Sequence, residues 1–192
     1  MMTMESLVLR NRTCRSFDES APITREIMTE LVDLARRTAS GMNKQPLRYR
    51  ILTERQDLDK MVRNARFGTA LKNIKLPPQG GHPTGYIILF TDSEAGSPDS
   101  LALKDVGIAA QTILLAATEQ GFAGCMLGSF NPETLVADFA IEKRYQPQLV
   151  IALGKPAERA LLTDPRDGSL AYYRDAAGNH CVPKRALEDV LI

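Results

Sequence analysis

Residues 104–120, KDVGIAAQTILLAATEQ, decide the fold of this chain. The apolar side chains of one face recur at helical spacing, at Val106, Ala109, Ala110, Ile113, Leu114 and Ala117. Ile108, Leu115 and Ala116 extend this apolar surface almost all round the helix. Such a helix is normally central to a fold or buried between subunits. Gly121 follows as a typical helix-ending glycine, so the pattern predicts one long, buried helix.

The segments on either side alternate between helical and strand patterns. Thr3 and Thr24 are placed to cap two helices before the first strand. A further helix is expected over residues 58–65, and strands are expected over residues 49–53, 86–91, 125–127 and 149–153. There is no internal repeat and no low-complexity linker. We therefore expect residues 1–192 to form a single domain of mixed α and β structure.

The apolar periodicity ends after Gly154. Residues 155–192 carry turn signals, including a hairpin turn expected at residues 176–179. A tail of this length without a core of its own is uncommon in a compact monomer. We therefore expect residues 155–192 to form an arm that packs on the same domain or on a partner subunit.

The composition narrows the class of protein. Lys and Arg total 24 and Asp and Glu total 23, and this balance argues against nucleic acid as a partner. No apolar run approaches the roughly 20 residues of a membrane span, and no secretory signal opens the chain. Three widely spaced cysteines, Cys14, Cys125 and Cys181, are expected to be free thiols. These features predict a soluble cytoplasmic protein without a membrane partner.

Several common catalytic motifs are missing from the sequence. There is no phosphate-binding Gly-x-x-x-x-Gly-Lys-Ser/Thr loop and no Gly-x-Gly-x-x-Gly after a strand. His82 and His180 are the only histidines, and neither has metal-ligand spacing to other candidate ligands, so no metal site is expected. A thiol enzyme that uses Cys125 or Cys181 with a histidine stays open as an alternative.

Two segments far apart in the chain have the chemistry of an anion site. Near the start, NRTCRSF (residues 11–17) offers Arg12, Thr13 and Arg15, and near the end Lys184 and Arg185 add two cations. Guanidinium groups and hydroxyls suit a phosphate. A third segment, RRTASGMNKQPL (residues 36–47), combines small residues with the amide of Asn43, which would allow close approach to a flat ligand.

Taken in order, these segments resemble the nitroreductase family of FMN-dependent oxidoreductases. The family's opening Arg/Asn-Arg-Ser/Thr-x-Arg-x-Phe is matched by residues 11–17, although Asn11 stands where arginine is frequent. Its Ala-Arg-x-Ala-Pro-Ser-x-x-Asn-x-Gln-Pro is matched by residues 35–46, with Ala39 in place of the proline. The apolar helix with GIAAQ (107–111), the segment GFAGCMLGSF (121–130) and IALGKP (151–156) complete the resemblance, and residues 173–185 are similar to the tail of one subgroup.

The resemblance implies an α+β fold in which helices flank a central, mainly antiparallel sheet. It also implies an intertwined homodimer with two FMN sites at the interface. Arg12, Thr13, Arg15, Lys184 and Arg185 would hold the FMN phosphate and ribityl chain. Thr38, Ala39, Ser40 and Asn43 would approach a flavin bound mainly by the other subunit, and the backbone of Gly128 and Ser129 would lie near its reactive edge.

The resemblance further implies a ping-pong reaction in which NADH or NADPH gives a hydride to flavin N5. A nitro compound, a quinone or a similar small acceptor is then reduced in the same cleft. No catalytic side chain is required, since the flavin carries the chemistry. Substrate choice is expected to depend on residues 67–83 and the loop at 130–133. An FMN-binding storage or sensing module without significant turnover is the other reading.

Overall fold

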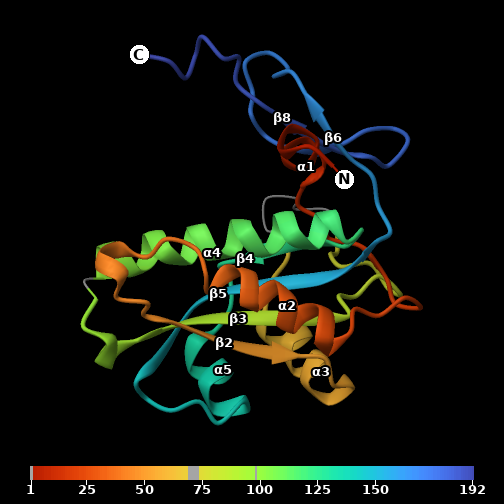
Figure 1. The fold of residues 1–192 in the computed structure, drawn as a ribbon. Coiled ribbons are helices and arrows are strands. Elements are labelled where there is room, and N and C mark those ends of the chain that lie inside the picture. The colour runs from red at the N-terminus through yellow and green to blue at the C-terminus, as the bar shows by residue number, and fades with distance from the viewer. Residues whose placement is uncertain (1, 69–73, 98) are drawn as a thin grey trace.

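A computed structural model describes residues 2–68, 74–97 and 99–192 of the chain (Figure 1). Its centre is a five-stranded sheet in which β5 pairs with three neighbours, and every pairing in this sheet is antiparallel. The strands are β1 (Phe17–Asp18), β2 (Leu47–Leu52), β3 (Gly85–Asp92), β4 (Ala123–Leu127) and β5 (Tyr145–Pro156). The order is β1-β5-β3-β2, with β4 also paired to β5. With the helices on both faces, this confirms the predicted α+β class.

The helices begin largely where the sequence places their caps. They are α1 (Met4–Arg10), α2 (Arg25–Ala35), α3 (Arg55–Asn64), α4 (Asp99–Glu119) and α5 (Pro132–Asp138), with short 3-10 turns η1 (Gly41–Asn43) and η2 (Ser93–Ala95). The hydroxyl of Thr3 accepts from the Ser6 amide at 3.2 Å, and that of Thr24 accepts from the Ile27 amide at 3.3 Å. The prediction of a loop over residues 130–133 is corrected, because α5 begins within this range. The side chain of Asn131 caps that helix by accepting from the Thr134 amide at 3.0 Å.

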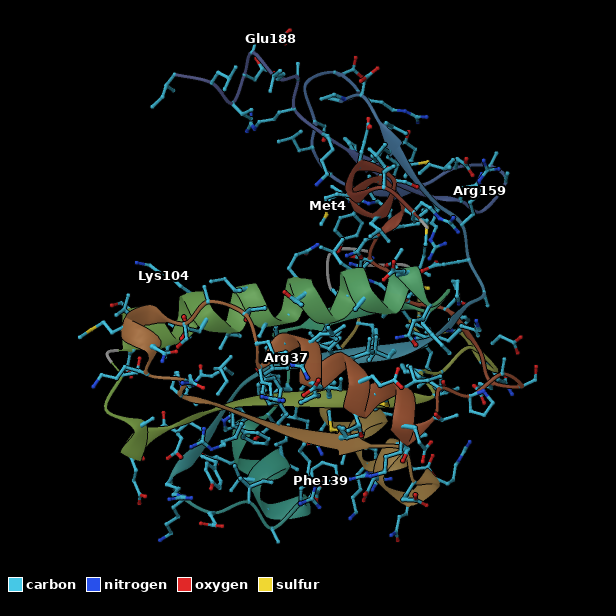
Figure 2. The ribbon with its side chains drawn as sticks, viewed as in Figure 1. Met4, Arg37, Lys104, Phe139, Arg159 and Glu188 are labelled. Atoms are coloured by element: carbon cyan, nitrogen blue, oxygen red, sulfur yellow. The ribbon has the colours of Figure 1, made fainter. Side chains whose placement is uncertain are left out.

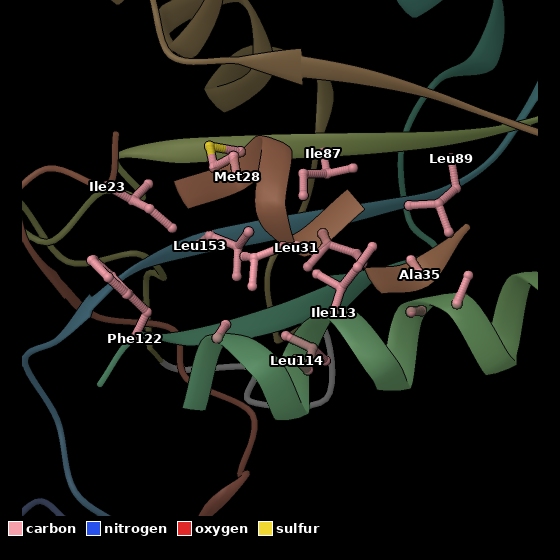
Figure 3. Packing of buried hydrophobic residues seen from close by; sticks show 14 of the residues in the cluster. Ile23, Met28, Leu31, Ala35, Ile87, Leu89, Ile113, Leu114, Phe122 and Leu153 are labelled. Carbon is pink, nitrogen blue, oxygen red and sulfur yellow. The ribbon is translucent and has the colours of Figure 1, made fainter. Parts of the chain in front are cut away.

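The central strands are buried on both faces, and alternate side chains serve two cores. Ile87, Leu89, Ile151 and Leu153 pack against α2 and α4 in the core of Figure 3. Their neighbours Tyr86, Ile88, Phe90, Val150 and Ala152 face the opposite core, which α3 and α5 cover. Figure 1 shows the result as a layered arrangement with the sheet between two pairs of helices.

Helix α4 is the predicted long apolar helix, and it buries one face only. Ala109, Ala110, Ile113 and Ala117 are almost fully buried, whereas Leu103 and Ile108 are 55% and 41% exposed. The sequence predicts no apolar run of membrane-spanning length, yet by length and composition alone α4 would suit a membrane span. Half of that span is buried inside this fold, and the core helices of soluble proteins meet the same criterion.

The C-terminal tail has more structure than its sequence pattern predicts. Strands β6 (Ala160–Thr163), β7 (Tyr173–Arg174) and β8 (His180–Pro183) form a second sheet in the order β6-β8-β7, drawn in blue in Figure 1. The predicted hairpin turn is confirmed between β7 and β8, where Gly178 has a φ of +79° and its amide donates to the Asp175 carbonyl at 3.0 Å. Residues 184–192 follow as an exposed end.

Candidate functional site

The basic segment near the N-terminus is fixed against the edge of the main sheet. Thr13 bridges to Gly124 of β4, and the Cys14 amide donates to the Gly124 carbonyl at 2.9 Å. Only glycine fits at position 124, because a Cβ there would lie 2.6 Å from the Ala152 carbonyl oxygen and 2.6 Å from Leu114. The core therefore sets the position of the backbone that carries Arg12 and Arg15.

The side chains of Arg12 and Arg15 both have donors to spare. Arg12 donates through Nη2 to the Val8 carbonyl at 2.7 Å, and Arg15 donates through Nη1 to Nε2 of His180 at 2.9 Å. The Nε of each arginine is buried without a hydrogen-bond partner, and neither guanidinium forms an ion pair within the described part of the chain. Burial also lowers the pKa of Arg12. The remaining N–H groups of each guanidinium have the chemistry to donate to an anion.

The C-terminal sheet contributes to this region through β8 rather than through the two predicted cations. His180 of β8 contacts Arg15, while Lys184 and Arg185 lie just beyond the strand with exposed side chains. The Lys184 amide donates to the Thr163 carbonyl at 3.0 Å, which fixes its backbone but leaves its ammonium group in solvent. The structure thus brings β8 to the N-terminal segment through His180, whereas no contact joins Lys184 or Arg185 to Arg12 or Arg15 within the described residues.

Gly128 and Ser129 extend the same region along β4. Both directly follow the end of β4, and Gly128 lies about 13 Å beyond Gly124 at the rise of a strand. The Ser129 carbonyl accepts from the Arg66 amide at 2.9 Å, and a Cβ at Gly128 would meet nothing within 4 Å. A cavity of about 770 Å³ opens beside them and is lined by Arg63, Asn64, Arg66, Ser129, Phe130, Asn131, Pro132, Glu133 and Thr134. Residues 69–73, part of the loop expected to influence substrate choice, lie outside the described residues.

A different part of the fold from that of Arg12 and Arg15 holds the loop that carries Thr38, Ala39, Ser40 and Asn43. It leaves the end of α2, lines a cavity of about 200 Å³ and turns sharply, with φ of +53° at Met42 and +52° at Asn43. Asp105 of α4 holds this loop by accepting from the Ser40 hydroxyl at 2.6 Å and from the Gly41 amide at 3.0 Å. The Ser40 hydroxyl in turn accepts from the Gln45 amide at 2.9 Å.

The two parts of the predicted site lie at opposite ends of α4. Gly41 packs on Leu101, whereas Gly124, beside Thr13, packs on Leu114. Leu101 and Leu114 are separated by about 20 Å along the helix at 1.5 Å per residue. In Figure 2, Lys104 marks the end of α4 nearer the loop, and Met4 lies above the other half of the helix. The two parts of the predicted site are therefore about 20 Å apart along α4 within one chain.

Asp105 is a site residue that sequence reasoning missed. It is 4% exposed, and its hydrogen bonds tie the 38–43 loop to α4. The available signal was a carboxylate on an otherwise apolar helix, since a buried charge must have partners. Its partner Ser40 is 65 positions away, so the sequence alone did not identify the pair.

Replacing Asp105 by alanine is expected to destabilise the fold by about 1–3 kcal/mol, because the Ser40 hydroxyl and the Gly41 amide lose their acceptor. The measurement is the free energy of unfolding in urea, with hydrogen exchange at Gly41 and Gln45 as a local readout. Glu119→Ala, which removes an exposed carboxylate from the same helix, should change neither. Unchanged amide protection in Asp105→Ala would contradict this role.

The cysteines lack the environment of a catalytic thiol. Cys14, Cys125 and Cys181 are all buried. Burial raises the pKa of the Cys14 thiol to about 12 and that of the Cys125 thiol to about 11. Both thiols therefore stay protonated at neutral pH, whereas a nucleophile must reach the thiolate form. Cys125 packs within the core that α3 and α5 cover.

Comparisons with known proteins agree with these features. A sequence model of the nitroreductase family matches residues 8–155. YodC of Bacillus subtilis (strain 168), which bears the name of an NAD(P)H nitroreductase, is 28% identical over 83% of this chain and 93% of its own. A Staphylococcus epidermidis structure described as an NAD(P)H:FMN oxidoreductase has a TM-score of 0.76 at 17% identity, covering 100% of this chain and 96% of its own.

A Desulfovibrio desulfuricans structure, described as a nitroreductase in complex with FMN, has a TM-score of 0.74 at 21% identity, again over 100% of this chain and 96% of its own. These structures share the fold. The family model covers most of the chain and includes the basic segment, the loop held by Asp105 and strands β1 to β4. The chain belongs to the nitroreductase family.

Proposed function

We propose that this protein is an FMN-dependent NAD(P)H oxidoreductase that acts in the cytoplasm. The observation that carries the proposal is the pair of arginines, Arg12 and Arg15, whose buried Nε donors have no partner among the described residues. They lie beside the strand that leads to Gly128 and Ser129. Family membership and the FMN bound by the Desulfovibrio protein support the same conclusion.

The residues present fit FMN. Arg12, Thr13 and Arg15 would hold its phosphate and ribityl chain, and Lys184 and Arg185 would add positive charge. The exposed backbone at Gly128 and Ser129 would face the edge of the flavin ring. When bound, FMN supplies the two-electron chemistry by accepting a hydride from NADH or NADPH and passing it to an acceptor.

We further propose that the site is completed by a second copy of the chain in a homodimer. The 38–43 loop is about 20 Å from the basic segment along α4, so it would serve the partner's flavin rather than its own. The outer face of α4, with exposed Leu103 and Ile108, would form the interface. In the 155–192 arm, residues 184–192 would contact the partner, because Leu187, Val190 and Leu191 are more than half exposed within one chain.

The open cavity beside Ser129 supports a reaction in which both substrates use one cleft. The chain would bind and orient the nicotinamide there, release the oxidised product and then admit a nitro compound, a quinone or another small acceptor by a ping-pong sequence. Arg63 and Arg66 line this cavity with exposed side chains. No side chain is assigned a catalytic role.

Colour and bleaching of the purified protein test this function. We expect a yellow protein whose flavin bleaches anaerobically when NADH or NADPH is added and recovers when a quinone follows. A yellow protein that neither nucleotide bleaches would favour an FMN storage or sensing module. A colourless protein that cannot be reconstituted with FMN would overturn both readings.

A further inference from the structure

A buried polar cluster surrounds Arg15 and includes the C-terminal sheet. Nε2 of His180 lies 2.9 Å from Nη1 of Arg15, and the ring of Tyr172 lies 5.0 Å from the guanidinium carbon. The Tyr172 and His180 rings meet edge to face with centroids 5.2 Å apart. His180 is only 1% exposed, so this contact is made inside the fold and not on its surface.

The hydrogen bond fixes the protonation state of His180. Arginine has only donors, so Nε2 is the acceptor and the neutral ring carries its proton on Nδ1, which is buried without a hydrogen-bond partner among the described residues. Burial, followed by the charge of Arg15, lowers the pKa of His180 and so favours the neutral ring. The histidine therefore restrains the guanidinium without neutralising it.

The carboxylate of Glu158, which also lies nearby, leaves the charge of the Arg15 guanidinium available to a ligand. Glu158 accepts from the backbone amide of Arg15 through one oxygen and pairs with the Arg174 guanidinium through the other. The Arg15 side chain has no carboxylate partner in the described ranges of the chain. A carboxylate in place of His180 would hold Arg15 equally well but would compete with an anionic ligand.

We propose that His180 is a positioning residue that holds the Arg15 guanidinium toward the FMN phosphate and leaves its positive charge for that phosphate. This role rests on the proposed FMN site. Strand β8 of the C-terminal sheet would then belong to the cofactor site through the neutral acceptor His180, in addition to the cations Lys184 and Arg185.

The test compares FMN and riboflavin binding to the apoprotein by flavin fluorescence. His180→Leu should weaken FMN binding about tenfold, because Arg15 loses its acceptor, and should leave riboflavin binding unchanged, because riboflavin has no phosphate. His180→Gln should restore FMN binding, since its amide oxygen can replace Nε2 as the acceptor. If His180→Leu does not fold, His180→Asn replaces it, because the shorter side chain keeps an amide that cannot reach Arg15.

A double-mutant cycle with Arg15→Gln separates positioning from a general structural role. If His180 acts through Arg15, the loss caused by His180→Leu should disappear when Arg15 is already glutamine. Additive losses, equal losses for FMN and riboflavin, or no loss in His180→Leu would each overturn the proposal. Failure of the wild-type apoprotein to bind either flavin would instead overturn the proposed function.

The pH dependence gives a further readout. Protonation of Nε2 would remove the acceptor and place two cations together, so FMN affinity should fall as the pH drops below the usual histidine value of about 6.5. Arg15, Glu158, Arg174 and Tyr172 are the ionisable groups that face His180, and Cys125 lies beside Arg15. His180→Gln keeps these groups and the phosphate, so it should lack the part of the decrease that belongs to His180. Identical pH profiles would overturn the proposal.

Discussion

The Arg15→Ala, Lys184→Ala double variant is expected to lose most of its FMN affinity. Hydrogen bonds to a charged group contribute about 1.5–3 kcal/mol, and the half-buried Arg15 should account for most of the loss. Lys184 is exposed, so solvent and salt screen its contribution. Together they should weaken FMN binding by roughly a hundredfold or more in a fluorescence titration of the apoprotein.

Arg10→Ala is the matched control for this experiment. Arg10 is an exposed arginine on α1, only five positions from Arg15, and its removal changes the net charge of the same region. It should leave the FMN dissociation constant within about twofold. Riboflavin should bind the double variant and the wild type alike. An unchanged FMN affinity in the double variant would show that the phosphate lies elsewhere.

Ile108→Glu is expected to abolish the proposed dimer. Ile108 lies on the outer face of α4, and an unpaired carboxylate buried in an interface costs about 3–5 kcal/mol. In a two-fold interface each dimer carries the substitution twice, so dissociation should be nearly complete. Light scattering at low micromolar concentration should report a monomer, and absorbance should show that FMN is lost with the dimer.

Leu34→Glu provides the comparison for Ile108→Glu. Leu34 is 44% exposed on α2, close to the 41% of Ile108, so both substitutions place a carboxylate on an exposed apolar position of a helix. The Leu34 variant should remain dimeric and yellow. A monomeric wild-type protein that holds FMN stably would contradict the shared site, as would an Ile108→Glu dimer that keeps its flavin.

The fold was predictable from the sequence where local patterns determine it. The caps at Thr3 and Thr24, the apolar face of α4 and the buried runs of β3 and β5 depend on residues within a few positions of one another. The second sheet was not predictable in this way. Its strands β6, β7 and β8 are two to four residues long, and pairing between distant segments defines them instead of any periodicity.

The candidate site, like the fold, was predictable only where local sequence patterns determine it. The motifs identified Arg12, Arg15 and the 38–43 loop, and the structure holds each of them in place. The residues that hold them were missed because their partners are distant in sequence: Asp105 is 65 positions from Ser40, and His180 is 165 positions from Arg15. Neither belongs to a motif: a lone histidine is usually a core residue, and although a carboxylate on an apolar helix signals a buried partner, it does not say which residue that partner is.

The pairing of the N-terminal segment with later strands also dictates when the site can form. Thr13 bridges to Gly124, Phe17 of β1 pairs with Pro156 of β5, and Arg15 contacts His180. During synthesis the first 17 residues emerge early, and although Phe17 also bonds to the Gly81 carbonyl, Thr13 has to wait for Gly124, more than a hundred residues later. The cofactor site should therefore form last, after release of nearly the whole chain, and nascent chains ending before Gly124 should not retain flavin.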